Sequence, residues 1–175
     1  MTESSCQICG GDFERAGAAS RLLKEQLKKI GVAPDILRRA MIAAHEAEMN
    51  VVIHARRGTM KAVLDDQQAR VEVIDEGPGI ADTGLAMTEG YSTAGSQARR
   101  LGFGAGMGLP NIRKSVDRFT IESTVGQGTR LRFTIYLKPR AGRGGRRSAL
   151  ANGVEAPPAA CPHLTCRQTL RRYSP

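Results

Sequence analysis

The stretch Gly102-Phe-Gly-Ala-Gly-Met-Gly-Leu109 places a glycine at every second position and leads into residues 109–118, which have the apolar spacing of a helix. A loop with so few side chains leaves its backbone N–H groups accessible. With the N-terminus of a helix behind it, such a loop can surround phosphates. A flexible connector is the alternative interpretation. No Gly-Lys-Ser/Thr follows, as a Walker loop requires, and no strand directly precedes it, as a dinucleotide fingerprint requires.

A second glycine motif, Asp75-Glu-Gly-Pro-Gly79, follows the apolar strand predicted at residues 69–74. A carboxylate at the end of a strand can accept a hydrogen bond from an exocyclic amine such as that of adenine. Gly77 and Gly79 would let the backbone approach a flat ring. Because Asp, Gly and Pro are also ordinary turn residues, a simple strand-to-loop turn is the alternative.

Glu46 and Asn50 lie four residues apart in a predicted helix, residues 34–54, so both side chains project from one face. The amide oxygen of Asn50 suits a Mg²⁺ ion that bridges phosphate oxygens. Glu46 would then orient or deprotonate a nucleophile at the terminal phosphate. For an isolated pair, two solvated helix residues would be the simpler interpretation, but this helix is rich in Ala and Met and is expected to be largely buried. Glu48 lies off that face, and we expect it to be solvated.

The remaining pattern predicts a compact α/β domain that ends near Pro139. Residues 75–108 form a glycine-rich region typical of a functional lid or a disordered loop, with a short helix near residues 82–87. The other predicted elements are helices at 18–30, 34–54 and 109–118, and antiparallel hairpins of strands 59–64 with 69–74 and 119–125 with 129–137.

The formal charge of +9 is unevenly distributed over the 175 residues. Residues 140–175 carry seven Arg and one Glu, or +6, which leaves +3 for residues 1–139. The tail has no periodicity, and we expect it to be basic and disordered. With seven aromatic residues in the chain, a base-stacking surface is disfavoured, so nucleic acid is not the expected partner. No apolar run is long enough for a membrane span, and no signal peptide is present, which predicts a soluble cytoplasmic protein.

The cysteines fall at the two ends of the chain. Cys6 and Cys9 could join Cys161, His163 and Cys166 in a zinc or iron–sulfur site if the termini met. The alternative, which we favour, is that the N-terminal pair belongs to a first strand with small buried cysteines. His45 and His54 have no second ligand at metal spacing, which favours histidines of the core or of a helix end.

Three motifs, taken together and in order, resemble the three nucleotide-binding boxes of the Bergerat-fold (GHKL) ATPases. They are the segment Glu46 to Asn50, the Asp75-Glu-Gly-Pro-Gly79 motif and Gly104-x-Gly-x-Gly108-Leu. This superfamily includes gyrase, histidine kinases and heat-shock chaperone ATPases. The resemblance covers residues 11–138. It implies a histidine-kinase-type α/β fold, an α+β two-layer sandwich in which a mixed, mainly antiparallel sheet is backed by about three helices. Within this superfamily, Gly102 to Ile112 looks like the branch of anti-sigma-factor serine/threonine protein kinases and switch kinases.

The resemblance also implies roles for residues. Asn50 would hold Mg²⁺, Glu46 would be the catalytic base, and Asp75 would bind adenine, while Arg99 or Arg100 would supply the arginine with which the lid contacts the terminal phosphate. The full set implied for ATP binding is Asn50, Asp75, Gly77, Gly79, Gly102, Gly104, Gly106, Gly108, Leu109 and Thr129.

We therefore expect a kinase that phosphorylates or binds a regulatory protein, either an anti-anti-sigma-like antagonist or a sigma factor. Relatives often form homodimers, and no membrane partner is expected. Two alternatives share the same boxes: a module that senses ATP or ADP without chemistry, and a histidine-kinase-like ATPase domain, for which little room exists before residue 35 for a phosphoacceptor hairpin. A third alternative is a metal or redox sensor built from the cysteine-bearing termini.

Overall fold

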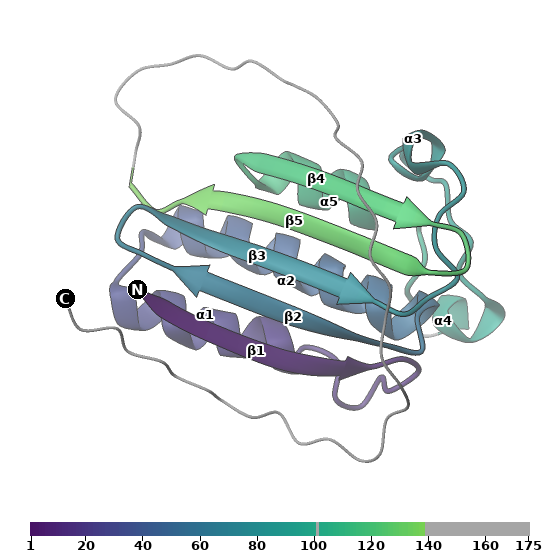
Figure 1. Cartoon of the computed structure of the whole chain (residues 1–175), viewed down its shortest axis with the longest axis horizontal. Helices are drawn as coiled ribbons and strands as arrows, with labels where there is room; N and C mark the ends of the chain where they lie inside the picture. The colour runs from purple at the N-terminus through teal and green to yellow at the C-terminus, as the bar shows by residue number, and fades with distance from the viewer. Residues whose placement is uncertain (101, 139–175) are drawn as a thin grey trace.

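The computed structural model describes residues 1–100 and 102–138, which form one five-stranded sheet and a layer of helices (Figure 1). In chain order the elements are β1 (Thr2–Cys9), α1 (Ala18–Ile30), α2 (Pro34–His54), β2 (Arg57–Leu64), β3 (Gln68–Asp75), α3 (Thr83–Ala86), α4 (Ser96–Arg100), α5 (Gly108–Ser115), β4 (Arg118–Thr124) and β5 (Gly128–Tyr136).

The strand order is β1-β2-β3-β5-β4, and every one of these pairings is antiparallel. The two predicted hairpins are β2–β3 and β4–β5. They join edge to edge, with Val73 of β3 opposite Leu131 of β5, although nearly sixty residues separate them in sequence. The mainly antiparallel sheet is thus confirmed, and the residues with the N-terminal cysteines add β1 as its outermost strand.

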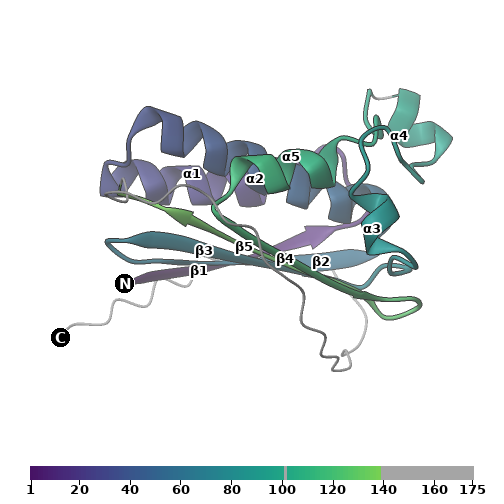
Figure 2. The ribbon, with the colours of Figure 1, turned by 90° about the horizontal axis from the view of Figure 1, so that it is seen from above.

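Helices α1, α2 and α5 cover one face of the sheet, which confirms a two-layer sandwich (Figure 2). Alternate strand residues point into this interface. The large side chains with under 2% exposure or close to it include Leu23, Leu27, Val51, Leu64, Ile112 and Ile135. On the opposite face, Arg132 donates to Glu72 at 2.8 Å and to Glu122 at 3.0 Å, as is typical of a solvated, charged surface.

Helix α1 has the predicted bounds and ends at Gly31, which adopts a left-handed conformation with φ 76°. Helix α5 ends earlier than predicted, at Ser115. The reason lies in α2, because Arg39 donates to the backbone oxygen of Ser115 at 3.0 Å and to the carboxylate of Asp117 at 2.9 Å. This long-range cap ends the helix and directs the chain into β4.

Glu48 is the clearest error of the sequence analysis. It was expected to be solvated, but it is 1% exposed and faces the N-terminus of α1. Its carboxylate accepts hydrogen bonds from the backbone N–H groups of Gly17, Ala19 and Ser20, each at 3.0 Å. Because the first N–H groups of a helix have no partner within the helix, a buried carboxylate there is stabilised.

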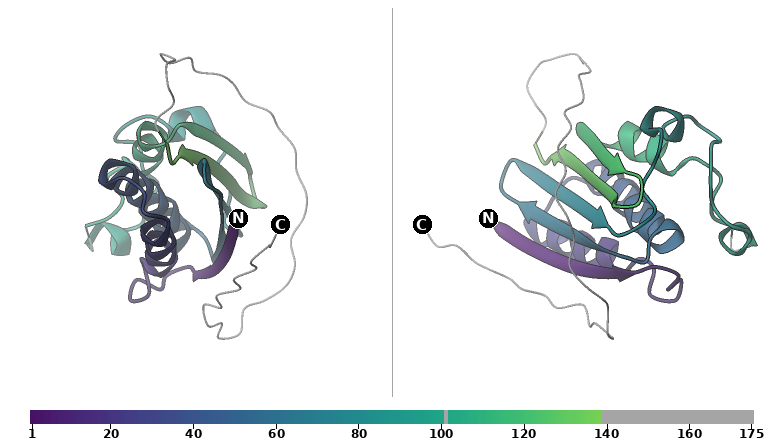
Figure 3. Two further views of the ribbon diagram at one scale, coloured as in Figure 1. Left: turned by 90° about the vertical axis from the view of Figure 1, so that its left-hand side faces the viewer. Right: turned by 45° about the vertical axis from the view of Figure 1, so that its right-hand side comes forward.

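The glycine-rich region was predicted at residues 75–108; its part 80–107, apart from residue 101, is called the lid below and lies at the end of the sheet where β3 ends and β5 begins (Figure 3). Its predicted short helix is α3, and the Asp82 side chain caps that helix by accepting from Leu85 N at 2.9 Å. The second lid helix, α4, was not expected from the sequence.

The two N-terminal cysteines both belong to β1, as the favoured alternative predicted. They are three positions apart, so their side chains leave opposite faces of the strand, and Cys6 is buried whereas Cys9 is half-buried. Within residues 1–100 and 102–138, no group of three or more His, Cys, Asp or Glu residues could hold a metal ion. Cys161, His163 and Cys166, with the whole predicted tail 140–175, lie outside the described residues.

In the described part of the chain, none of the helices combines the length and the apolar character that crossing a membrane requires.

Candidate functional site

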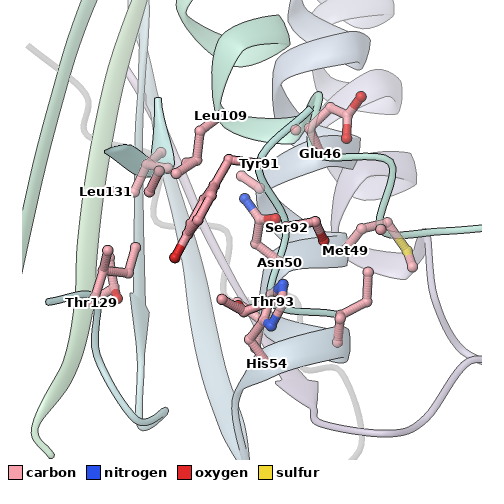
Figure 4. A pocket seen from close by; sticks show the side chains of 18 of the residues that line it. Glu46, Met49, Asn50, His54, Tyr91, Ser92, Thr93, Leu109, Thr129 and Leu131 are labelled. Carbon is pink, nitrogen blue, oxygen red and sulfur yellow. The ribbon is translucent and has the colours of Figure 1, made fainter. Parts of the chain in front are cut away.

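A cavity of about 720 Å³ lies between α2, the ends of β3 and β5, and the lid. This is within the size range of small-molecule sites. The site residues predicted from the sequence line it, with the exception of Gly77 and of the two candidate lid arginines, Arg99 and Arg100. They are Glu46, Asn50, Asp75, Gly79, Gly102, Gly104, Gly106, Gly108, Leu109 and Thr129. Figure 4 shows that Glu46, Asn50 and Leu109 come from the helix layer and Thr129 from the sheet.

Asp75 ends β3 at the wall of this cavity. Its Oδ1 atom accepts hydrogen bonds from Gly77 N at 2.8 Å and from Thr129 N at 3.2 Å. Burial raises the pKa of Asp75 above its ordinary value, and the two backbone hydrogen bonds partly oppose this rise. Both donors use the same oxygen. The described residues therefore leave Oδ2 as the oxygen available to a ligand.

The two glycines after Asp75 are required by packing. A Cβ atom on Gly77 would lie 2.8 Å from Oδ1 of Asp75, and one on Gly79, where φ is 71°, would lie 2.1 Å from the backbone oxygen of Thr124. Gly77 thus supports the Asp75 carboxylate and does not itself line the cavity. Gly79 packs against the β4–β5 turn, to which the chain is also bound by the hydrogen bond from Gly126 N to the oxygen of Pro78.

A pair of hydroxyls lies next to this corner of the cavity, and one of them, that of Thr129, belongs to a lining residue. The Ser123 hydroxyl lies 2.9 Å from that of Thr129, donates to the oxygen of Gly128 at 3.0 Å, and accepts from Ile80 N at 2.8 Å. Thr129 was predicted and Ser123 was not. The position of Ser123, one residue before the end of β4 and opposite Thr129 in the ladder, was the available signal.

Glu46 and Asn50 reach the other side of the cavity from successive turns of α2, as their spacing predicted. A Cβ atom on Gly108 would lie 3.2 Å from Oδ1 of Asn50 and 3.4 Å from Oε2 of Glu46. The first residue of α5 therefore touches both polar side chains. The other carboxylate oxygen of Glu46 accepts from the side-chain amide of Asn111 at 2.8 Å, a contact that the sequence did not reveal.

The glycines of the 102–108 stretch have different roles. Gly102 follows α4, with φ 84° and its N–H bound to the oxygen of Arg99 at 3.0 Å. A Cβ on Gly104 would lie 2.4 Å from Cβ of Ala94, and one on Gly106 would lie 2.4 Å from the backbone carbon of Gly90. Gly104 and Gly106 therefore let the 102–108 stretch lie close to Ala94 and Gly90 of the lid. Gly108 leaves space beside Asn50.

Tyr91 is a cavity residue that sequence reasoning missed. Its side chain is 42% exposed and points between Asn50 of α2 and the Leu131 and Thr129 side chains of β5 (Figure 4). Phe103 also lines the cavity and stacks on Phe13 of the β1–α1 loop, with ring centroids 6.0 Å apart. No sequence pattern connects Phe13 with Phe103, and only the small number of aromatic residues in the chain could have drawn attention to them.

The two histidines of α2 also line the cavity, and neither belongs to the core. His54 is the last residue of α2, which agrees with the predicted helix-end position. His45 lies in the middle of the helix and is exposed, so neither the core nor the helix-end prediction holds for it. Partial burial lowers the pKa of His54 below its ordinary value, which favours the neutral imidazole.

An antiparallel sheet backed by helices, with a helix-borne amide, a strand-end carboxylate and a glycine loop around one cavity, defines an ATP-binding domain of the histidine-kinase type. Comparison with known families agrees, because residues 33–140 match the family described as "Histidine kinase-, DNA gyrase B-, and HSP90-like ATPase". The chain belongs to this family, as the three sequence motifs indicated.

Two relatives fall in the branch that the Gly102 to Ile112 stretch resembles. The "Serine/threonine-protein kinase RsbT" of Bacillus subtilis (strain 168) is 30% identical over 142 residues, which cover 79% of this chain and 100% of that protein. An "Anti-sigma F factor" from Caldanaerobacter subterraneus subsp. tengcongensis is 37% identical over 100 residues, 54% of this chain and 66% of that protein. Among solved structures, the mycobacterial sensor histidine kinase MprB matches 59% of this chain and 73% of its own, at 16% identity and a TM-score of 0.43.

Proposed function

We propose that this chain is an anti-sigma regulatory serine/threonine protein kinase, which transfers the terminal phosphoryl group of ATP to a hydroxyl of a regulatory partner protein. The observation that carries the proposal is the meeting of Glu46 and Asn50 at Gly108, on the same cavity as Asp75. A carboxylate, an amide oxygen and a helix N-terminus together form a suitable site for the charged end of ATP.

The adenine would lie at the Asp75 end of the cavity. Oδ2 of Asp75 can accept from the exocyclic amine of the base, while Val73, Ile121 and Leu131 supply apolar walls for the ring. Guanine has an oxygen in place of that amine, so Asp75 would repel it. This arrangement supports a preference for ATP over GTP.

Asn50 would hold Mg²⁺. The space that a side chain on Gly108 would fill borders Oδ1 of Asn50, and an amide oxygen is a ligand of the hard type that Mg²⁺ prefers. When bound, ATP·Mg²⁺ supplies the transferable phosphoryl group and neutralises charge on it. The open loop at Gly104 to Gly108 leaves room for the phosphates.

Glu46 would accept the proton of the acceptor hydroxyl, because its carboxylate lies within one helical turn of Asn50 and beside the N-terminus of α5. Of the two candidate lid arginines, Arg99 is better supported. Its Cγ atom lies 3.8 Å from the Cβ position of Gly104, so its stem packs against the phosphate loop.

The partner would dock over the lid and present its Ser or Thr to the open end of the cavity. Leu85, 45% exposed, and Tyr91 offer apolar contacts beside that opening. The relatives' names support an anti-anti-sigma-like antagonist or a sigma factor as this partner. A cytoplasmic location and a homodimer remain part of the proposal.

The test is incubation of the chain with γ-labelled ATP, Mg²⁺ and candidate partner proteins, followed by phosphosite mapping. Phosphoserine or phosphothreonine on a partner is expected, and Glu46→Gln is expected to abolish it while the Kd for ADP changes by less than about twofold. Glu25→Gln, on the exposed side of α1, is the matched control. Stable binding of a partner without any transfer would instead favour a nucleotide-sensing module, and transfer that survives Glu46→Gln would exclude Glu46 as the base.

A further inference from the structure

Asn111 lies one turn into α5 and is directed at Glu46. Its side-chain Nδ2 donates to Oε1 of Glu46 at 2.8 Å, across 65 residues of sequence. Both side chains are half-buried, which makes a hydrogen bond to a carboxylate stronger than it would be in open solvent.

The backbone that carries Asn111 is firmly held. Its neighbours Pro110 and Ile112 are buried, Ile112 in the hydrophobic core, and its own N–H bonds to the oxygen of Met107 at 2.8 Å. The same helix begins at Gly108, next to Oε2 of Glu46. One segment therefore lies beside both oxygens of the carboxylate: the Asn111 amide donates to Oε1, and Gly108 leaves space beside Oε2.

A glutamate has three side-chain torsions, and a base must be set within a fraction of an ångström of the proton that it accepts. The Asn111 contact removes most of this freedom. It also distinguishes the two oxygens, because Oε1 accepts the Asn111 hydrogen bond, whereas Oε2 borders the space beside the cavity residue Gly108.

We propose that Asn111 is a positioning residue that fixes the Glu46 carboxylate relative to the N-terminus of α5, so that Oε2 is the oxygen that receives the proton. This inference rests on the proposed kinase function. In the transfer, the acceptor oxygen bonds to the terminal phosphorus as the bond to the bridging oxygen of ADP breaks. The proton of the acceptor hydroxyl passes to Oε2 of Glu46.

The kinetic test uses Asn111→Leu, which removes the donor at similar volume. A positioning role predicts that kcat for phosphotransfer falls by between about tenfold and a hundredfold, while KM for ATP and the Kd for ADP change by less than about twofold. Asn111→Gln, which keeps an amide donor, should recover part of kcat. Arg113→Leu, on the exposed face of α5, is the matched control and should leave kcat unchanged.

A second measurement needs neither nucleotide nor activity. The shift in Tm caused by Asn111→Leu is measured in the wild type and in a Glu46→Leu background, which removes the acceptor. If the two side chains are bonded, the shift in the second background is less than half of that in the first. Equal shifts in both backgrounds would overturn the contact.

The two tests separate the possible failures. If Glu46→Gln abolishes transfer but Asn111→Leu keeps the wild-type kcat, the kinase proposal stands and the role of Asn111 is overturned. Proportional loss of kcat and of ADP affinity would also overturn it, because Asn111 would then be merely structural. If Glu46→Gln keeps full transfer while the two Tm shifts differ, Glu46 is not the base, the proposed role of Asn111 is overturned with it, and only the structural contact stands. Should Asn111→Leu not fold, Asn111→Ser replaces it in both measurements.

Discussion

The hydroxyl of Ser20 donates to Oε2 of Glu48 across 2.8 Å in the interior of the protein, where Glu48 is almost fully buried. The same carboxylate accepts three backbone N–H groups at the start of α1. Glu48 therefore joins α1 to α2 only two residues from Glu46, which lines the cavity. Two glutamates of one helix, so close in sequence, have separate roles: one holds the helices together and the other serves the site.

Replacing Glu48 with Ala should lower the free energy of unfolding by about 2–5 kcal/mol, because buried N–H groups would lose their acceptor. Glu48→Gln should cost less, since its amide oxygen still accepts from Gly17 and Ala19. Chemical denaturation of the nucleotide-free protein measures both. Glu25→Ala, on the exposed face of α1, is the control, and an equal effect of the two Ala variants would contradict the buried role of Glu48.

Asp75 should destabilise the nucleotide-free protein at neutral pH. Burial raises its pKa, so the folded state binds the Asp75 proton more tightly than the unfolded state does. The stability that this proton contributes is fully present below the ordinary value near 3.8 and is lost as pH rises through the raised pKa. Asp75→Asn keeps an oxygen for Gly77 and Thr129 and removes the charge. Its free energy of unfolding, measured by chemical denaturation, should exceed that of the wild type at pH 7 by about 1.4 kcal/mol for each unit of the pKa shift, and the difference should shrink below pH 4. A difference that does not vary with pH would refute this.

Gly108→Ala should weaken nucleotide binding without harming the fold. Gly108 has an ordinary helical conformation, and alanine in its place favours α5. The added methyl would fill the space beside Asn50 and Glu46, so the Kd for ADP·Mg²⁺ should rise by about tenfold or more while Tm is unchanged or higher. Gly95→Ala is the matched control in the lid, where an added Cβ would meet no atom within 4 Å. Calorimetry that finds the same Kd for both variants would show that the space beside Asn50 is not used.

Tyr91→Trp should report nucleotide binding directly, because the chain contains no tryptophan and this side chain extends into the cavity (Figure 4). Adding ADP·Mg²⁺ should change its fluorescence in a saturable way. Tyr136→Trp, on β5 outside the cavity lining, should not respond. A response at position 136 and none at position 91 would contradict the placement of the ligand.

Much of the site follows from local patterns. Glu46 and Asn50 share a face because a helix repeats every 3.6 residues, and Asp75 ends a strand because an apolar alternation stops there. Both features need only a few neighbouring residues, so the sequence predicts them together with the helix bounds of α1 and α2.

Other features depend on contacts between distant segments. The burial of Glu48 requires the N-terminus of α1 to pack against α2, and the early end of α5 requires Arg39 from 76 residues away. Asn111 reaches Glu46 only because α2 and α5 lie side by side. Periodicity carries no information on such pairs. For that reason the polar residues that hold the elements together escaped prediction, as did Tyr91 of the lid, while Glu46, Asn50 and Asp75 of the cavity did not.

Recognition of adenine by Asp75 is tested most directly by isothermal titration of the purified chain with ATP·Mg²⁺, with GTP·Mg²⁺ and, after Asp75→Asn, with ATP·Mg²⁺ again. We expect saturable binding of one ATP, binding of GTP weaker by about tenfold or more, and a similar loss for ATP in the variant, as a charge-assisted hydrogen bond implies. An absence of heat with ATP, or equal affinities in all three titrations, would contradict the assignment of this cavity.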